Sequence, residues 1–155
     1  MMKRYLLILA VALLLLTGCG KQEAATSQAI SEGDALEISR SELSTSIKIY
    51  SFTVDGLQME VLAAKDKDGT VRTAFNTCQV CNGSPKAYFE EKGDSVACQN
   101  CGNAFGRKDV GVLSGGCNPY PIFASDREDT ENAVRISYDY LKDNAGLFAR
   151  WKNNG

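Results

Sequence analysis

The chain has 155 residues, with 17 Lys and Arg against 19 Asp and Glu and no histidine, which gives a formal net charge of −2. This mildly acidic balance excludes the basic footprint of a nucleic-acid-binding protein and offers no attraction to anionic lipid. The absence of histidine excludes Rieske, blue-copper and catalytic zinc sites, all of which use imidazole ligands.

The amino terminus has the pattern of an export signal. Lys3 and Arg4 form a positive start, and residues 6–16 are an apolar segment too short to span a bilayer comfortably. The segment ends in "LTGC", which resembles the lipobox of bacterial lipoproteins. The resemblance implies that residues 1–18 are a cleaved signal peptide and that Cys19 is lipidated, which would anchor the protein in the cell membrane on its extracytoplasmic face. An ordinary secretory signal and an uncleaved anchor helix are the alternatives.

Residues 19–33 are predicted to be a flexible tether between the membrane and a folded domain. The stretch "GKQEAATSQAISEGD" is poor in large apolar residues and rich in Ala, Ser, Gln and Glu. A short helix packed on the domain is the alternative. Residues 34–155 are then predicted to form one domain, because this length is ample for a single hydrophobic core.

Four β-strands are predicted before the cysteine-rich region, at about 36–40, 46–54, 57–64 and 71–76. These segments alternate apolar and polar residues or are rich in β-branched and aromatic ones. Asp55-Gly56 and Asp68-Gly69 separate the last three segments, and Asp-Gly between such runs favours a tight hairpin. The pattern therefore predicts an antiparallel meander.

The rest of the chain is predicted to add a hairpin, a strand and a helix. "KAYFE" and "DSVAC" would be short strands around residues 91–94, and "AVRIS" would be a strand at 133–137. A helix is predicted over 138–152, because apolar residues recur there at helical spacing. Those that could share one face are Tyr140, Leu141, Leu147, Phe148 and Trp151. The predicted fold class is mainly β (α+β), an antiparallel meander with a two-knuckle cysteine metal-site insertion and a C-terminal helix.

The cysteines carry the most specific signal in the chain. Those beyond the tether are Cys78, Cys81, Cys98, Cys101 and Cys117. The first four form two Cys-x-x-Cys pairs separated by sixteen residues. This spacing is typical of a four-thiolate metal site, because the sulfurs of each tight turn can face one point. Gly83 and Gly102 come after the pairs and permit the positive φ that such knuckles need.

Two other uses of these cysteines stay open. A disulfide framework would suit an exported protein, but five thiols leave one unpaired and a domain of this size does not need disulfide bonds for its stability. A thiol–disulfide oxidoreductase would place Cys-x-x-Cys at the start of a helix. Loop residues come after both pairs instead. A metal site is therefore the favoured interpretation.

Cys117 has a distinctive context. Gly115 and Gly116 precede it, and Pro119 and Pro121 lie just after it. The glycines permit close approach of the backbone, and the prolines stiffen the chain on the carboxyl side of the cysteine. This context suits a further ligand, a capping thiol or a reactive partner in electron or metal transfer. A small buried residue in a tight loop is the alternative.

The segment from Val71 to Ile122 resembles the FtrD-like domain, described as a membrane iron–sulfur-containing domain and associated with bacterial iron-uptake systems. The resemblance rests on "VRTAF", the two cysteine pairs and "GGCNP". It implies that the ligands are Cys78, Cys81, Cys98 and Cys101, with Cys117 as a candidate. Some members carry a multi-spanning membrane portion, so a lone lipid-anchored domain would need a separate permease or redox partner of a metal uptake system.

The metal itself is left open by the residues. Four thiolates accept iron, zinc or copper(I). Lys3-Arg4 is not the twin-arginine pattern, so the site would fill after export. Iron or an iron–sulfur cluster, which the resemblance implies, would support electron transfer or metal handling. Zinc would indicate a structural interaction module, and a metal-free protein would indicate a thiol–disulfide redox function. No other motif indicates catalysis, which favours a metal-binding or electron-transfer protein over an enzyme.

Overall fold

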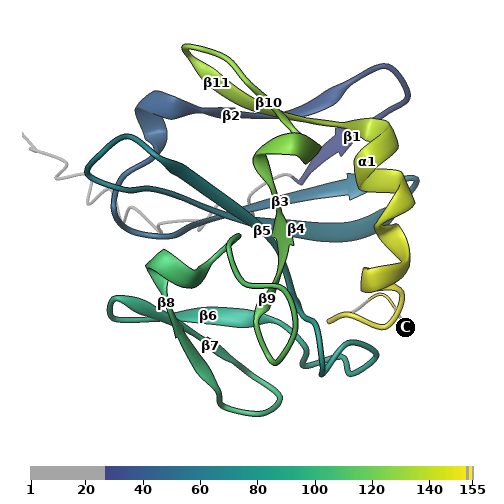
Figure 1. Ribbon diagram of the computed structural model, residues 1–155. Helices are drawn as coiled ribbons and strands as arrows, with labels where there is room; N and C mark the ends of the chain where they lie inside the picture. Colours follow the sequence, from purple (N-terminus) through teal and green to yellow (C-terminus); the bar gives the residue numbers. More distant parts are fainter. Residues whose placement is uncertain (1–26, 153, 155) are drawn as a thin grey trace, which may run out of the picture.

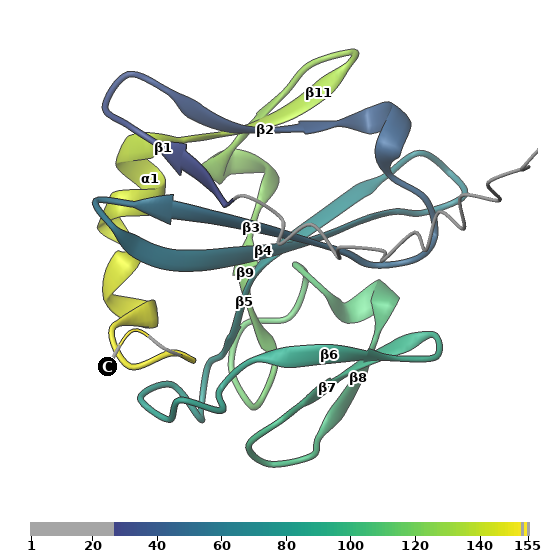
Figure 2. The same ribbon diagram turned by 180° about the vertical axis from the view of Figure 1, so that it is seen from behind.

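Three β-sheets are stacked in layers in the computed structural model, which describes residues 27–152 and 154 (Figure 1). The central sheet has the order β1-β3-β4-β5-β9, from Gln28–Ile30, Lys48–Val54, Leu57–Lys65, Val71–Cys78 and Pro119–Ile122. One outer sheet has the order β10-β11-β2, from Glu128–Asp129, Ala133–Ser137 and Ala35–Ser39. The other has the order β6-β7-β8, from Phe89–Lys92, Ser95–Cys98 and Ala104–Gly106. The view from behind shows the same layering (Figure 2).

The hairpins of the central sheet obey the turn chemistry of the sequence. β3 and β4 pair antiparallel up to Val54 opposite Leu57, so Asp55 and Gly56 form a two-residue loop. Both have positive φ, 49° and 81°, as a type I′ turn requires. β4 and β5 also pair antiparallel. The predicted mainly β fold with antiparallel strands is confirmed.

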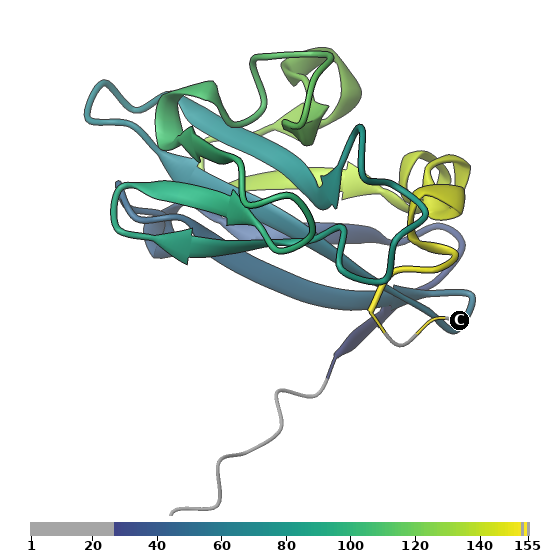
Figure 3. The same ribbon diagram turned by 90° about the horizontal axis from the view of Figure 1, so that it is seen from below.

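β4 is buried on both faces and divides the interior into two cores. Val61 and Ala63 belong to the larger core, which lies against β2, β11 and the C-terminal helices. Leu62 and Ala64 belong to a second core, shared with β6, β7 and the cysteine-bearing turns. Successive residues of a strand point to opposite faces, so one apolar run serves both cores. The cysteines lie in and against this second core, and Figure 3 views the molecule from this side.

The C-terminal helical segment is shorter than predicted. α1 spans Tyr138–Asp143, with the Ser137 side chain accepting a hydrogen bond from the backbone N–H of Tyr140 at its start. Asn144 caps the end of the α-helix, with its Nδ2 donating to the carbonyl of Tyr140, and a 3-10 helix, Ala145–Phe148 (η4), continues the chain. The apolar face is nevertheless used, because Leu141, Phe148 and Trp151 are all buried.

The predicted meander is wrong in its first strand. Ala35–Ser39 does not extend the central sheet but pairs antiparallel with β11 in the outer sheet. Leu36 and Ile38 thereby cover the larger core from the opposite side. Strands β8, β9 and β10 were not predicted. β9 contains Pro119 and Pro121, which argue against an interior strand, but it lies at the edge of the central sheet, where proline is tolerated.

The ordered domain begins earlier than predicted. Gln28–Ile30, placed by the sequence in the flexible tether, forms a strand parallel to β3, and Ile30 is buried in the larger core. The predicted signal peptide, residues 1–18, and the predicted lipidation of Cys19 lie outside the described residues and stay predictions.

Candidate metal centre

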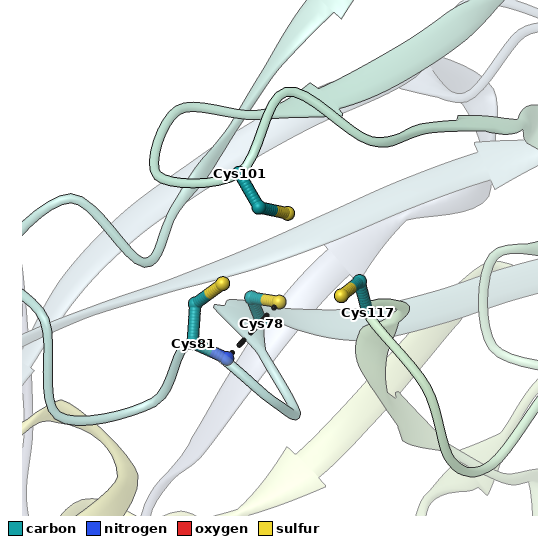
Figure 4. A group of neighbouring side chains, drawn as sticks. All are labelled: Cys78, Cys81, Cys101 and Cys117. Carbon is teal, nitrogen blue, oxygen red and sulfur yellow. Dashed lines mark hydrogen bonds between the residues drawn. The ribbon is translucent and has the colours of Figure 1, made fainter.

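Four cysteine sulfurs converge at one end of the second core. Their Sγ atoms all lie within 4.8 Å of one another, and they belong to Cys78, Cys81, Cys101 and Cys117. Cys78 is the last residue of β5, and Cys81 lies in the turn directly after it. Cys101 lies in the turn after β7, and Cys117 lies in the loop that precedes β9. Figure 4 shows the four sulfurs directed toward a common space. This separation suits thiolate ligands of one metal site.

Cys98 occupies a different position from the other four. It is the last residue of β7 and is 1% exposed within the second core. It adjoins the cluster, because its side chain is within hydrogen-bonding reach of the Cys101 thiol and helps to lower the pKa of that thiol, but its sulfur is not among the four that are mutually close. Of the residues expected from the sequence, the structure brings together three from the two pairs with Cys117, the further candidate.

The first knuckle, the turn at residues 78–81, is closed by hydrogen bonds of its own backbone. The N–H of Cys81 donates to the Sγ of Cys78 at 3.4 Å, and the N–H of Ser84 donates to the carbonyl of Cys81 at 3.0 Å. The N–H of Cys78 donates to the carbonyl of Ala87 at 2.9 Å, which returns the chain to the strand. N–H groups directed at a sulfur stabilise its thiolate form.

The second knuckle, the turn at residues 98–101, is also closed by backbone hydrogen bonds. The N–H of Gly102 donates to the carbonyl of Cys98 at 2.8 Å, and the N–H of Cys98 donates to the carbonyl of Asn103 at 2.9 Å. All four glycines proposed to support the site have positive φ. They are Gly83 at 98°, Gly102 at 75°, Gly115 at 93° and Gly116 at 70°. The φ of Gly102 lets the chain close this turn without strain.

The Gln79 side chain holds the Cys117 loop against the first knuckle. Its Oε1 accepts a hydrogen bond from the N–H of Gly115 at 2.7 Å, and its Nε2 donates to the carbonyl of Pro119 at 3.1 Å. Its backbone N–H donates to the carbonyl of Asn118 at 3.0 Å. Gln79 therefore contacts the loop on both sides of Cys117.

Gly111 fixes the start of the same loop on the central sheet. It has a φ of 71°, and a Cβ atom built there would lie 2.4 Å from the carbonyl oxygen of Thr73. No side chain fits this approach. Sequence reasoning missed both Gln79 and Gly111, because a glutamine between two cysteines and a glycine in a loop give no signal of a long-range contact.

Polar side chains tie the knuckles to each other and to the C-terminal segment. Ser84 Oγ donates to Asn100 Oδ1 at 2.7 Å, which joins the two knuckles. Asn82 Nδ2 donates to the carbonyl of Leu147 at 2.6 Å, which joins the first knuckle to η4. The site is thus braced from several elements that lie far apart in the sequence.

A buried polar network supports β5 just before Cys78. Asn76 Nδ2 donates to Glu60 Oε2 at 2.8 Å, and Asn76 Oδ1 accepts from the N–H of Phe89 at 2.7 Å. Lys152 Nζ lies 2.8 Å from Glu60 Oε1, and the Nε1–H of Trp151 donates to the carbonyl of Asn76 at 2.8 Å. The buried carboxylate is therefore paired and hydrogen-bonded, as burial of a charge requires.

The thiols differ in their readiness to ionise. Burial raises the pKa of the Cys78 thiol and also that of the Cys81 thiol. The pKa of Cys101 is lowered, chiefly by a hydrogen bond from the backbone of Asn103. Cys101 is also the exposed member of the cluster. The cluster therefore has a buried side at Cys78 and a reactive, solvent-facing side at Cys101.

We expect Cys101 to be alkylated at least about tenfold faster than Cys78 in reduced, metal-free protein at pH 8, because only the thiolate reacts and its fraction rises as the pKa falls below the solution pH. Iodoacetamide labelling and peptide mass spectrometry would measure both rates. The advantage should shrink as the pH rises, because the Cys78 thiol then begins to ionise as well. Faster labelling of Cys78 at pH 8 would contradict the pKa order.

Among residues 27–152, no helix has both the length and the apolar character needed to cross a membrane. A search of curated protein sequences finds no match. Among solved structures, a naphthalene 1,2-dioxygenase mutant bound to phenanthrene is similar with a TM-score of 0.44 and 16% identity. That similarity covers 72% of this chain and 29% of the dioxygenase chain.

A protein-family comparison identifies residues 43–148 with the family described as "Membrane iron-sulfur containing protein FtrD-like". The matched range contains both knuckles, the Cys117 loop and η4. It also extends well beyond the segment that carries the resemblance in the sequence. The resemblance is therefore confirmed, and the chain belongs to the FtrD-like family.

Proposed function

We propose that this protein is an extracytoplasmic lipoprotein that holds iron through cysteine thiolates and transfers single electrons beside a metal uptake system. The observation that carries the proposal is the convergence of four cysteine sulfurs within 4.8 Å of one another. Thiolates bind soft and borderline transition metals, and iron bound to them supplies one-electron chemistry.

The placement of the cluster supports exchange with a partner. Cys78 is buried, which shields one side of the site from water, whereas Cys101 is exposed. Val80, within the first knuckle, is 63% exposed, and Leu113, in the Cys117 loop, is 45% exposed. These exposed apolar side chains belong to two of the ligand-bearing segments, so a partner that packed on them would exclude water and lie close to the metal site, which favours electron transfer.

The proposal is tested with the full chain, purified in detergent, reduced, and offered iron(II), zinc and copper(I) in competition under anaerobic conditions. Bound iron should give thiolate-to-iron charge-transfer bands after oxidation, and the bands should bleach on reduction. The reduced protein should then pass one electron per chain to ferric citrate, which a ferrous chelator would report.

The other results of this experiment each contradict the proposal. Tightly held zinc without colour would make the domain a structural interaction module. Metal-free protein with a disulfide between knuckle cysteines would make it a thiol–disulfide redox protein. Preference for copper(I) would indicate copper handling instead of iron chemistry.

A further inference from the structure

We infer that the metal centre is mononuclear and is completed by Cys117 in place of Cys98, so the site takes one metal ion and no inorganic sulfide. The ligands would be Cys78, Cys81, Cys101 and Cys117. The inference rests on the proposed function, because it concerns the metal held at the same site, and it departs from the iron–sulfur description of the family.

The spacing of the sulfurs fits a single ion. A metal–sulfur bond of about 2.3 Å in tetrahedral geometry places the four sulfurs about 3.8 Å apart. All separations among the four cysteine sulfurs are within 4.8 Å, so small rotations of the side chains would close them around one ion.

The same spacing does not fit a sulfide-bridged cluster. In such a cluster at least some of the cysteines bind different irons, and for these pairs the separation of the irons adds to that of their ligands. Thiolates on different irons therefore lie roughly 5.5–6.5 Å apart. No pair among these four sulfurs reaches that separation. A cluster would require the knuckles and the Cys117 loop to move apart.

The surrounding contacts oppose such an expansion. The Cys117 loop is held on one side by the hydrogen bonds of Gln79 to Gly115 and Pro119. At its start it packs against the backbone of Thr73 through Gly111. The two knuckles are joined through Ser84 and Asn100. These contacts therefore hold the three ligand-bearing segments at the sulfur spacing seen in the structure, and a cluster would have to break some of them.

Cys98 has a structural position instead of a ligand position. It is buried in the second core, and its backbone N–H and C=O both form the hydrogen bonds that close the second knuckle. These bonds use no atom of the side chain, so replacement of the thiol by a methyl group keeps them. Burial alone does not distinguish Cys98, because Cys78, a ligand in this assignment, is just as buried. The distinction rests on the Cys98 sulfur, which is not among the four that lie within 4.8 Å of one another.

The test is reconstitution of the reduced full chain with iron(II) and sulfide together, under anaerobic conditions, and then analysis of iron and acid-labile sulfide per chain. The expected result is one iron and no labile sulfide, even with sulfide in excess. In parallel, cobalt(II) should bind once per chain and give the visible d–d bands of a tetrahedral thiolate site. Two or more irons with matching sulfide would overturn the inference while leaving the proposed function intact. Failure of any metal to bind would overturn both.

Matched alanine variants identify the fourth ligand. Since the loss of an outer-shell partner weakens metal affinity about 10–100-fold, removal of a ligand should cost more than about 100-fold. We expect this loss of cobalt(II) affinity for Cys117→Ala, and less than about a threefold change for Cys98→Ala. Far-UV circular dichroism of the metal-free proteins would show that both variants are folded. If Cys98→Ala loses the metal and Cys117→Ala keeps it, the assignment of ligands is wrong.

Discussion

Replacement of Gln79 by alanine is expected to weaken metal binding about 10–100-fold, the range for residues that hold metal ligands in place without touching the metal. The amide of Gln79 bonds to Gly115 before Cys117 and to Pro119 after it. Without these bonds the loop would have to be ordered when the metal binds, and the entropy of ordering it would reduce the affinity.

Gln99 provides a matched control, since it occupies the same place in the second Cys-x-x-Cys pair. Its Nε2 donates only within its own segment, to the carbonyl of Ala97 at 3.1 Å. We therefore expect Gln99→Ala to change the affinity less than about threefold. Competition titrations with cobalt(II) and a chelator would measure both variants against the unchanged protein. Equal losses in the two variants would show that the Gln79 side chain has no special role in holding the Cys117 loop.

A second variant separates the loss of the Gln79 hydrogen bonds from the simple loss of packing. Gln79→Glu keeps the oxygen that accepts from Gly115 but loses the donor to Pro119. It also adds a negative charge beside thiolates, which disfavours their ionisation. Its affinity should therefore be no better than that of Gln79→Ala. Affinity equal to that of the unchanged protein would contradict the role of the amide.

The sequence predicts the parts of the candidate site that depend on local turns, but not the parts that depend on contacts between distant segments. The knuckles are local, and the glycines just after them have the positive φ that the spacing implies. The choice between Cys98 and Cys117 is not local. It depends on how β7 ends in the second core and on how the loop before β9 returns to β5. No pattern within either segment carries that information.

The fold is also predictable where neighbouring segments pair and not predictable where distant segments pair. The β3–β4–β5 meander is predictable because alternating residues and Asp-Gly turns act between neighbours in the chain. The pairing of β2 with β11 joins residues about a hundred positions apart, and β9 joins the sheet despite Pro119 and Pro121. Such pairings are selected by burial of a shared core, which the alternation of a single strand does not identify.

Trp151 is expected to be the most important side chain for stability among those next to the site. It is 1% exposed and packs edge-to-face on Phe148, with ring centroids 5.2 Å apart. Trp151→Ala should lower the free energy of unfolding by about 3–5 kcal/mol, as for other large aromatic residues truncated in a core. Trp151→Phe should cost less, about 1–3 kcal/mol, because packing is largely kept while the carbonyl of Asn76 loses its buried donor.

Urea unfolding of the reduced, metal-free full chain, monitored by circular dichroism, would measure these changes without the contribution of metal binding. Phe123→Ala is the control, because Phe123 is also aromatic but is 41% exposed, and substitutions at such positions usually stay within about 0.5 kcal/mol. If Trp151→Phe were neutral, the indole N–H would not support β5. If it matched Trp151→Ala, the hydrogen bond to Asn76 would outweigh the packing. Since Asn76 lies two residues before Cys78, the intermediate result would show that the C-terminal segment stabilises the strand that carries the first ligand.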